Sequence, residues 1–258
     1  MIQINSNIKI LEIEHPETWL ETCWQIIQEH LQVEYYNDLY EAENIFDFLF
    51  ENQSEILDSI REQFISHFSY IKAYHATKVT NIETFLTEGI KPLDTSKSNK
   101  IIIDFFKTTT TSPKVSHETI INAINRFTTK GNDKTRENLI YFQLYKNELL
   151  TCSTQYLLYG SERVLSIISH IGTHNYKKYL KEIGKPTIFH VAVPCEQIIN
   201  INSILLELFS ITANYYIYSE FPNKPDLYIK TSTIINPTFI LKHEYPDIRN
   251  LNDQNIYV

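Results

Sequence analysis

A histidine, two acidic residues and several tyrosines are the side chains of this sequence best suited to chemistry. His75 ends a short β-like run, Glu162 lies in the first turn of a helical stretch, and Asp226 heads a late strand. A carboxylate such as Asp226 or Glu162 can stabilise the positive charge of an oxocarbenium-like transition state, as in glycoside hydrolysis. A tyrosine face can stack on a flat ring, a role for Tyr159 or else Tyr156. These residue types suit the cleavage of a glycosidic bond.

Each of these residues also has a purely structural interpretation. A lone histidine at a strand end is often structural, and Tyr159 could belong to the core. Glu162 follows Ser161, a typical N-cap, so its charge could simply stabilise the helix dipole by about 0.3 to 1 kcal/mol. Asp226 follows Pro225 and could be a turn residue. Both interpretations therefore stay open from the residues alone.

The sequence lacks the short motifs of several large enzyme classes. It has no GxxxxGK[ST], GxGxxG, HExxH or GxSxG pattern, so P-loop, dinucleotide-fold, zincin and α/β-hydrolase functions lose their usual support. Cys23, Cys152 and Cys195 are isolated and odd in number, which excludes a disulfide framework and a CxxC metal knuckle. Cys195 is expected to be a buried thiol rather than a nucleophile. We expect no metal.

Composition places the chain among ordinary globular proteins. With 17 Tyr, 14 Phe and only five Gly, it is neither disordered nor collagen-like. No apolar run approaches the roughly 18 to 20 residues of a membrane span, and the N-terminus does not resemble a secretory signal, so we expect a soluble, cytoplasmic protein without membrane contact. The net charge of −8 disfavours nonspecific nucleic-acid binding. A basic patch at Lys177, Lys178, Lys181 and Lys185 could still contact RNA or DNA, or be a solvated helix face.

Apolar residues at helical spacing predict an N-terminal helical region over residues 1–69. The first set starts at Pro16, the second covers 39–50 and the third covers 56–68. Acidic residues fill the outer faces, from Glu41 to Glu62. They indicate a solvated surface or, alternatively, a docking surface for a basic partner.

The remaining residues, 70–258, predict an α+β domain. Short strands are expected at Tyr70–His75, Ile101–Phe106, Leu139–Tyr145, Leu149–Ser153, Pro186–Pro194, Asp226–Lys230 and Thr238–Lys242. Helices are expected after a capping box at 80–83, over Ser116–Phe127, from Ser161, and over Ser203–Ile211. Gly89 is placed for a turn of positive φ. A Rossmann repeat is excluded because no Gly-rich turn follows the first strand.

The segment His75-Ala76-Thr77, followed by a short helix and Gly89, resembles the ADP-ribosyltransferase superfamily. The similar branch is the His–Tyr–acid branch of diphtheria toxin and the poly(ADP-ribose) polymerases. Leu149–Ser153 leading to Tyr159 is similar to that family's middle strand and aromatic. The run from Asp226 to Ile240 is similar to its late acidic strand and final strand. Ala76 stands where the family usually has Gly, and Asp226 where Glu is commoner.

The resemblance implies a fold, a reaction and a set of site residues. It implies a split, mixed or antiparallel β core with flanking helices, and NAD as substrate without a metal. It assigns catalysis to Asp226, Glu162 and His75. It assigns NAD binding to His75, Ala76, Thr77, Ser153, Tyr156 and Tyr159.

The implied function is mono-ADP-ribosyl transfer from NAD to a macromolecule, with release of nicotinamide. The acceptor would be protein, RNA or DNA, in the manner of a bacterial toxin or anti-phage effector, and an antitoxin or chaperone would be a fitting partner. Two alternatives stay open: a non-catalytic α+β interaction module, and an RNA 2′-phosphotransferase of the same fold. The second needs a basic phosphate site, for which the sequence offers only scattered arginines at 61, 126, 136, 163 and 249.

Overall fold

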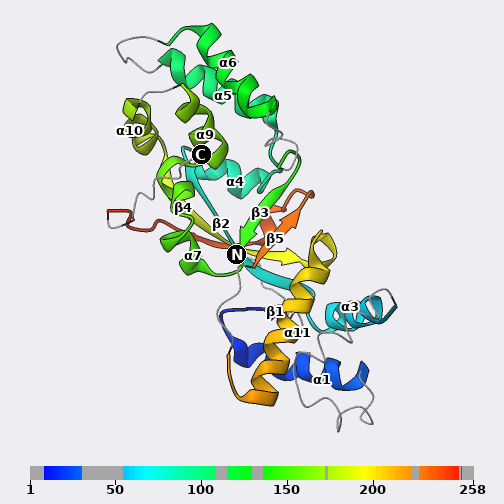
Figure 1. Ribbon diagram of the computed structural model, residues 1–258. Helices are drawn as coiled ribbons and strands as arrows, with labels where there is room; N and C mark the ends of the chain where they lie inside the picture. The colour runs from blue at the N-terminus through cyan, green and yellow to red at the C-terminus, as the bar shows by residue number, and fades with distance from the viewer. Residues whose placement is uncertain are drawn as a thin grey trace. The chain divides into compact units, whose positions relative to one another are not determined.

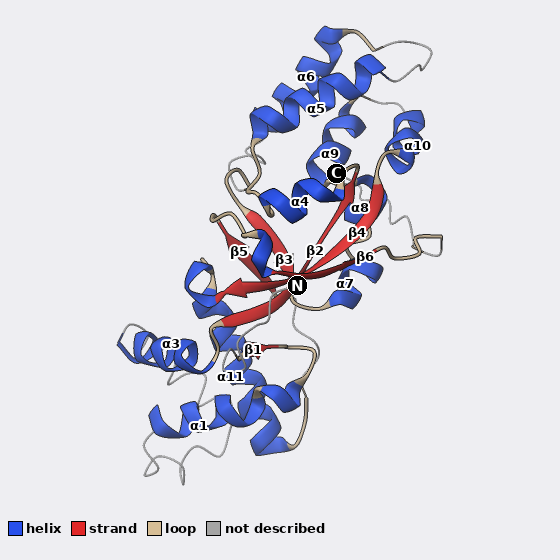
Figure 2. Cartoon of the chain, turned by 180° about the vertical axis from the view of Figure 1, so that it is seen from behind, coloured by secondary structure: helices blue, strands red, loops and turns tan. Residues whose placement is uncertain are grey.

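The computed structural model describes residues 9–30, 55–108, 115–129, 136–171, 174–221, 227–249 and 251. Within these ranges the chain combines a sheet with many helices (Figures 1 and 2), which confirms the predicted α+β class. The strands are β1 (Ile10–Leu11), β2 (Tyr70–Val79), β3 (Ile140–Gln143), β4 (Lys185–Pro194), β5 (Tyr228–Thr231) and β6 (Ile240–Glu244). The α-helices are α1 (Leu20–His30), α3 (Glu55–His67), α4 (Ile82–Glu88), α5 (Thr95–Thr108), α6 (His117–Thr129), α7 (Lys146–Thr151), α8 (Gln155–Tyr159), α9 (Glu162–His170), α10 (His174–Glu182) and α11 (Ile201–Tyr218).

The strands form a sheet in the order β5-β3-β2-β4-β6, and β1 pairs in parallel with β2. β3 runs antiparallel to β2, with Tyr74 opposite Gln143, and β6 runs antiparallel to β4. In β4 every residue from Thr187 to Pro194 is buried. Continuous burial is typical of a strand that is covered on both faces.

The chain divides into two compact units, which we call unit 1 (residues 1–73 and 192–230) and unit 2 (residues 74–191 and 231–258). In unit 1, α1 packs against both α3 and α11. The buried stripe of α1 is Leu20, Cys23, Ile26 and Ile27. The first and third predicted N-terminal helices are therefore confirmed, whereas the second, at 39–50, lies outside the described residues.

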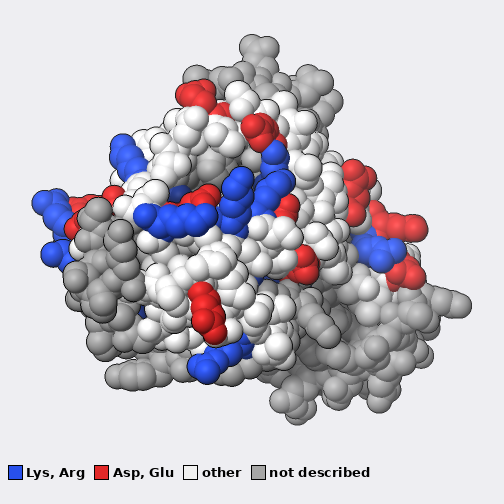
Figure 3. Space-filling view, turned by 90° about the horizontal axis from the view of Figure 1, so that it is seen from above, with Lys and Arg blue, Asp and Glu red and all other residues white. Residues whose placement is uncertain are grey.

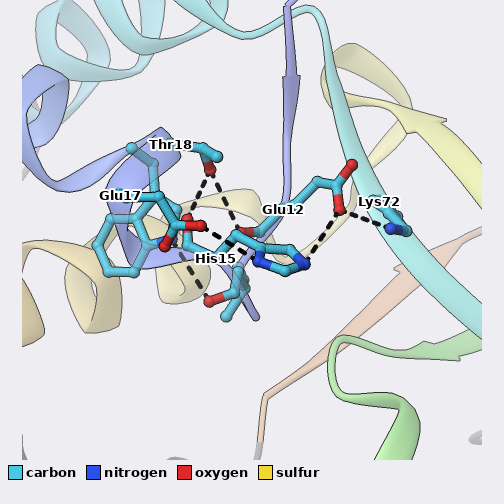
Figure 4. A network of polar contacts seen from close by, with 7 residues as sticks. Glu12, His15, Glu17, Thr18 and Lys72 are labelled. Carbon is cyan, nitrogen blue, oxygen red and sulfur yellow. Dashed lines mark hydrogen bonds and ion pairs between the residues drawn. The ribbon is translucent and has the colours of Figure 1, made fainter.

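A polar network fastens β1 and the segment after it in unit 1 (Figure 4). The Lys72 ammonium on β2 lies 2.5 Å from Glu12 Oε2. His15 lies between two carboxylates, with Nε2 3.8 Å from Glu12 Oε2 and Nδ1 3.3 Å from Glu17 Oε1. The Thr18 hydroxyl donates to the carbonyl of His15 at 2.7 Å, in the short 3₁₀ turn Pro16–Thr18 that leads into α1. These contacts position the start of the helical region.

Unit 2 contains apolar clusters that pack its helices together. α5, α6 and α9 share one cluster, and α5, α8, α9 and α10 share another. A third cluster joins β2, α7, α8 and β4 through Tyr74, Ala76, Leu149, Leu157 and Ile188. The buried Arg163 of α9 donates to Ser98 Oγ (2.9 Å) and Asn99 Oδ1 (2.8 Å) of α5. The α8–α9 segment is thus held from several sides.

Two predicted strands are wrong, because both segments are helical. Ile101–Phe106 lies inside α5, where Ser98, Ile102 and Phe105 are buried at helical spacing. Its β-branched run favours a strand, but packing of this apolar stripe outweighs the weak intrinsic preference. Leu149–Ser153 falls largely in α7, which buries Leu149 against β2 and β4.

The predicted helix ends are largely correct. Ser161 is the N-cap of α9, and its hydroxyl accepts from the N–H of Val164. At α4 the cap is Asn81 rather than Thr80, since the Asn81 side chain accepts from Glu83 N–H, in line with the stronger N-cap preference of asparagine. Gly89 has φ +78°, and a Cβ there would lie 2.0 Å from the carbonyl oxygen of Ile235, so only glycine fits.

Within the described part of the chain, no helix combines the length and apolar character needed to span a membrane.

Candidate functional site

The turn between α8 and α9 positions Glu162. Gly160 ends α8 with φ +83°, a conformation that glycine adopts without strain, and Ser161 then caps α9. The Thr77 hydroxyl on β2 donates to the carbonyl of Gly160 at 3.0 Å, which ties the turn to the sheet. Glu162 therefore begins α9 at its positive N-terminal end, where a carboxylate is stabilised.

Glu162 is held by Arg136 and Tyr156, and we call these three residues the Glu162 cluster. The Arg136 guanidinium binds both carboxylate oxygens, Nη1 to Oε2 at 2.7 Å and Nη2 to Oε1 at 3.0 Å. The Tyr156 hydroxyl donates to Oε2 at 3.0 Å. A bidentate contact of this kind fixes the plane of the carboxylate as well as its position. A carboxylate has about four acceptor sites, so Glu162 can still accept from a further donor.

The charges of the Glu162 cluster reinforce its hydrogen bonds. Burial, together with the negative charge of Glu162, raises the pKa of Tyr156 to about 12, so the phenol stays protonated as a donor. Burial lowers the pKa of Arg136, but the hydrogen bonds and charge of Glu162 raise that pKa on balance. The arginine and the phenol therefore keep their protons across the physiological range.

His75 lies on the other face of β2 from the residues beside it. Tyr74 and Ala76 are buried in the cluster with Leu157 of α8, and successive strand residues point to opposite faces. The His75 ring is 5.5 Å from that of Phe142, and its Nδ1 is 3.1 Å from the carbonyl oxygen of Tyr141. Burial lowers the pKa of His75, which favours a neutral ring that donates from Nδ1. These contacts of His75 involve β3 and not the residues of the Glu162 cluster.

The two tyrosines of α8 have different surroundings. Tyr159 is buried in the core cluster of α5, α8, α9 and α10, with the Lys181 ammonium 5.5 Å from its ring centre. Tyr156 is only half-buried and contacts the acid. Ser153 is half-buried after the end of α7, where its N–H donates to the Glu148 carbonyl at 2.7 Å. Asp226 lies outside the described residues.

Arg136 is the site residue that sequence reasoning missed. In the sequence it is only one of several scattered arginines, and its partner lies 26 positions further along the chain. Three other arginines are engaged separately, Arg61 with Asp58 (3.1 Å), Arg163 with Ser98 and Asn99, and Arg249 with Asp247 (2.5 Å). These contacts do not gather the arginines into the basic phosphate site that a phosphotransferase would need.

A second carboxylate cluster, also unpredicted, lies where β4 and β6 pair in unit 2. Glu244 Oε1 is 3.2 Å from the Lys146 ammonium and 3.5 Å from Nε2 of the buried His190. The rings of His190 and Tyr74 meet edge to face, with centroids 4.9 Å apart. Burial raises the pKa of Glu244, but Lys146 and His190 lower that pKa on balance. We call Glu244, Lys146 and His190 the Glu244 cluster.

The remaining candidates are less suited to a reaction. Across the described ranges, no group of three or more His, Cys, Asp or Glu side chains could hold a metal ion. Burial raises the pKa of the Cys23 and Cys195 thiols to about 12, so neither is a ready nucleophile. In the basic patch, the Lys185 ammonium lies 3.3 Å from the centre of the Tyr245 ring. On the face seen from above, basic and acidic side chains are intermixed (Figure 3).

Comparison of the chain with protein-family models, with curated proteins and with solved structures finds no match.

Proposed function

We propose that this protein is an NAD-dependent mono-ADP-ribosyltransferase whose catalytic acid is Glu162. The observation that carries the proposal is the Glu162 cluster, in which a carboxylate is fixed by Arg136 and touched by the phenol of Tyr156. Its carboxylate and aromatic ring are the groups that the resemblance to the superfamily calls for. The α+β fold is compatible with an ADP-ribosyltransferase core.

The reaction breaks the bond between nicotinamide and the ribose of NAD. The electron pair of that bond leaves with nicotinamide, which departs neutral, and positive charge develops on the ribose. Glu162 would accept a hydrogen bond from a ribose hydroxyl and stabilise this charge electrostatically. A nucleophilic atom of the acceptor then bonds to the ribose carbon and loses its proton to solvent or to the carboxylate.

Tyr156, rather than Tyr159, would be the aromatic that stacks on nicotinamide. Tyr159 is enclosed by the core, whereas Tyr156 is half-buried beside Glu162. A stacked pair of aromatic rings contributes about 0.5 to 1.5 kcal/mol beyond the area it buries. His75 contacts Phe142 and the carbonyl of Tyr141, so it would contact NAD without touching Glu162.

The acceptor is proposed to be a macromolecule, in keeping with a cytoplasmic toxin or anti-phage effector. The test is incubation of the purified protein with labelled NAD and a cell lysate, followed by separation of protein, RNA and DNA. We expect label in one fraction and loss of that label in Glu162→Ala, with retention in Asp226→Ala. Glu88→Ala is the matched control, because Glu88 is an exposed glutamate that also pairs with a cation, Lys91.

Three outcomes would revise the proposal in different ways. Loss of label in Asp226→Ala but not in Glu162→Ala would transfer the role of the acid to Asp226. NAD binding by calorimetry without nicotinamide release would indicate a non-catalytic module. Absence of both binding and release would overturn the proposal altogether.

A further inference from the structure

Four aromatic side chains gather on the surface of unit 1, where α1 packs against the end of α11. The rings of Trp24 and Tyr216 are stacked, with centroids 4.6 Å apart and planes 7° apart. Tyr215 lies edge-on to Tyr216 at 5.4 Å and contacts Phe221 at 4.7 Å. We call these four residues the aromatic patch, and α1 and α11 are seen together in Figure 1.

The aromatic patch is open to solvent. The exposed fractions are 36% for Tyr215, 40% for Tyr216 and 52% for Phe221. Single exposed apolar residues are normal, but a contiguous group of them is typical of an interaction surface. Since the aromatic rings already contact one another, a ligand would meet a preassembled surface.

The turn after α11 places Phe221 against this surface. Ser219 ends the helix in the left-handed conformation, with φ +57° and ψ +28°, which a residue other than glycine adopts at a cost. Two residues further on, the ring of Phe221 contacts that of Tyr215. The helix therefore ends in a way that adds a fourth ring to the three already in contact.

The charged side chains nearest the aromatic patch along the chain are acidic. Glu21 lies three residues before Trp24 on α1, and Glu220 directly precedes Phe221. Side chains three residues apart on a helix are neighbours, so Glu21 lies beside Trp24, whose ring stacks on Tyr216. In line with this, desolvation and the charge of Glu21 raise the pKa of Tyr216. Such a surface repels phosphate groups and attracts cations.

We propose that the aromatic patch binds an arginine-bearing segment of a partner protein in extended form. Guanidinium groups would lie on Phe221 and on the face of Tyr216 opposite Trp24, as cation–π contacts require, while Glu21 and Glu220 flank the bound chain. The aromatic faces and the two flanking carboxylates, Glu21 and Glu220, which we call the acidic rim, both favour a positively charged ligand. Nucleic acid is disfavoured because its phosphates would meet the carboxylates of these segments.

The test is fluorescence anisotropy of labelled ten-residue peptides with the full-length protein. The probes alternate serine with arginine, with lysine or with glutamate, and a single-stranded RNA of ten nucleotides is a fourth probe. We expect the arginine peptide to bind more tightly than the lysine peptide, and the glutamate peptide and the RNA not to bind. Tyr216→Ala should weaken arginine-peptide binding at least fivefold, and Glu21→Lys should weaken it by a similar factor.

Tyr245→Ala is the matched control, because Tyr245 is a similarly exposed tyrosine in unit 2. Glu220→Lys tests the same acidic rim without touching a packed ring, so it guards against a folding defect in Tyr216→Ala. Equal affinities of wild type, Tyr216→Ala and Glu220→Lys for the arginine peptide would overturn the proposal. Binding of the RNA in preference to the peptides would overturn it as well. Neither result bears on NAD cleavage in unit 2.

Discussion

Glu162 and Glu244 of unit 2 are each paired with a basic side chain and contacted by a polar atom of a ring residue, but the geometry of these contacts differs. The Glu162 side chain is 27% exposed and that of Glu244 is 34% exposed, so solvent screens the two to a similar degree. Glu162 is bound through both oxygens by the planar guanidinium of Arg136. Glu244 meets the ammonium of Lys146 and the imidazole of His190 through one oxygen, Oε1. The same residue type is thus fixed in one place and less constrained in the other.

The two glutamates also differ in their third contact, which is Tyr156 at Glu162 and His190 at Glu244. Tyr156 has its pKa raised to about 12, so it donates to Glu162 at any physiological pH. His190 lies 3.5 Å from Glu244 Oε1, a longer contact than the 3.0 Å hydrogen bond from Tyr156 to Glu162. A carboxylate with fixed geometry suits transition-state stabilisation, because it needs no reorganisation. The comparison therefore favours Glu162 over Glu244 as the residue that would act in the proposed reaction.

Replacement of Glu162 by glutamine should have the largest effect on the rate of nicotinamide release. Glu162→Gln removes the charge that would stabilise the ribose cation and should lower the rate of nicotinamide release about 100- to 1,000-fold. Glu244→Gln, its matched control, should leave that rate within about twofold. Chromatographic assay of nicotinamide released from NAD measures both. Equal losses in the two variants would break the distinction between the clusters.

Removal of the cation should affect folding stability unequally. Arg136→Met leaves the Glu162 carboxylate without its bidentate partner, and we expect a loss of about 1 to 2 kcal/mol in the free energy of unfolding after allowance for solvent screening. Lys146→Met removes a single contact at 3.2 Å and should cost less than about 1 kcal/mol. Urea denaturation followed by circular dichroism gives both values. A larger loss for Lys146→Met would reverse the ranking.

Tyr156→Phe separates the hydroxyl of Tyr156 from its ring. The variant loses one hydrogen bond to a charged acceptor but keeps the stacking face, so unfolding should become easier by about 1 kcal/mol. Nicotinamide release should fall by less than about tenfold, since Arg136 still fixes Glu162. A double-mutant cycle with Arg136→Met tests whether the two donors act together. Strict additivity would show that the phenol and the guanidinium position Glu162 independently.

The local features of the Glu162 cluster could be predicted from the sequence. Ser161 as a cap, Gly160 at a helix end and Glu162 in the first turn are signals carried by neighbouring residues. Tyr156 is a candidate on the same grounds, because it lies close to Glu162 along the chain. Arg136 could not be found in this way, because its contact depends on how the segment before β3 meets α9 in three dimensions. No periodicity links positions so far apart.

The errors in the fold have a similar origin. The β-branched residues of Ile101–Phe106 favour a strand, although Asp94 offers a helix signal just before them: its carboxylate accepts from the N–H of Lys97 at 3.0 Å. Tertiary packing decides between strand and helix here, because the helix α5 buries Ile102 and Phe105 against neighbouring helices. The predicted α+β class is nevertheless correct, because most of the other strands and helices form where their patterns place them. Likewise, the residue type of Tyr159 does not show whether it belongs to the core or to the binding site, and its position in the core follows only from packing.

The smallest expected effect is the pH dependence of stability that Glu244 confers. Its folded-state pKa is lowered, so its contribution is present above the unfolded value of about 4.3 and is lost as pH falls through the folded value. Because the side chain is partly exposed, the contribution should be under about 0.5 kcal/mol. Wild type should therefore exceed Glu244→Gln in urea midpoint at about pH 5.5, and the gap should close towards about pH 3. A gap that persists at the lower pH would mean that Lys146 and His190 do not stabilise the charged form of Glu244, and the contrast between the two clusters would then rest on geometry alone.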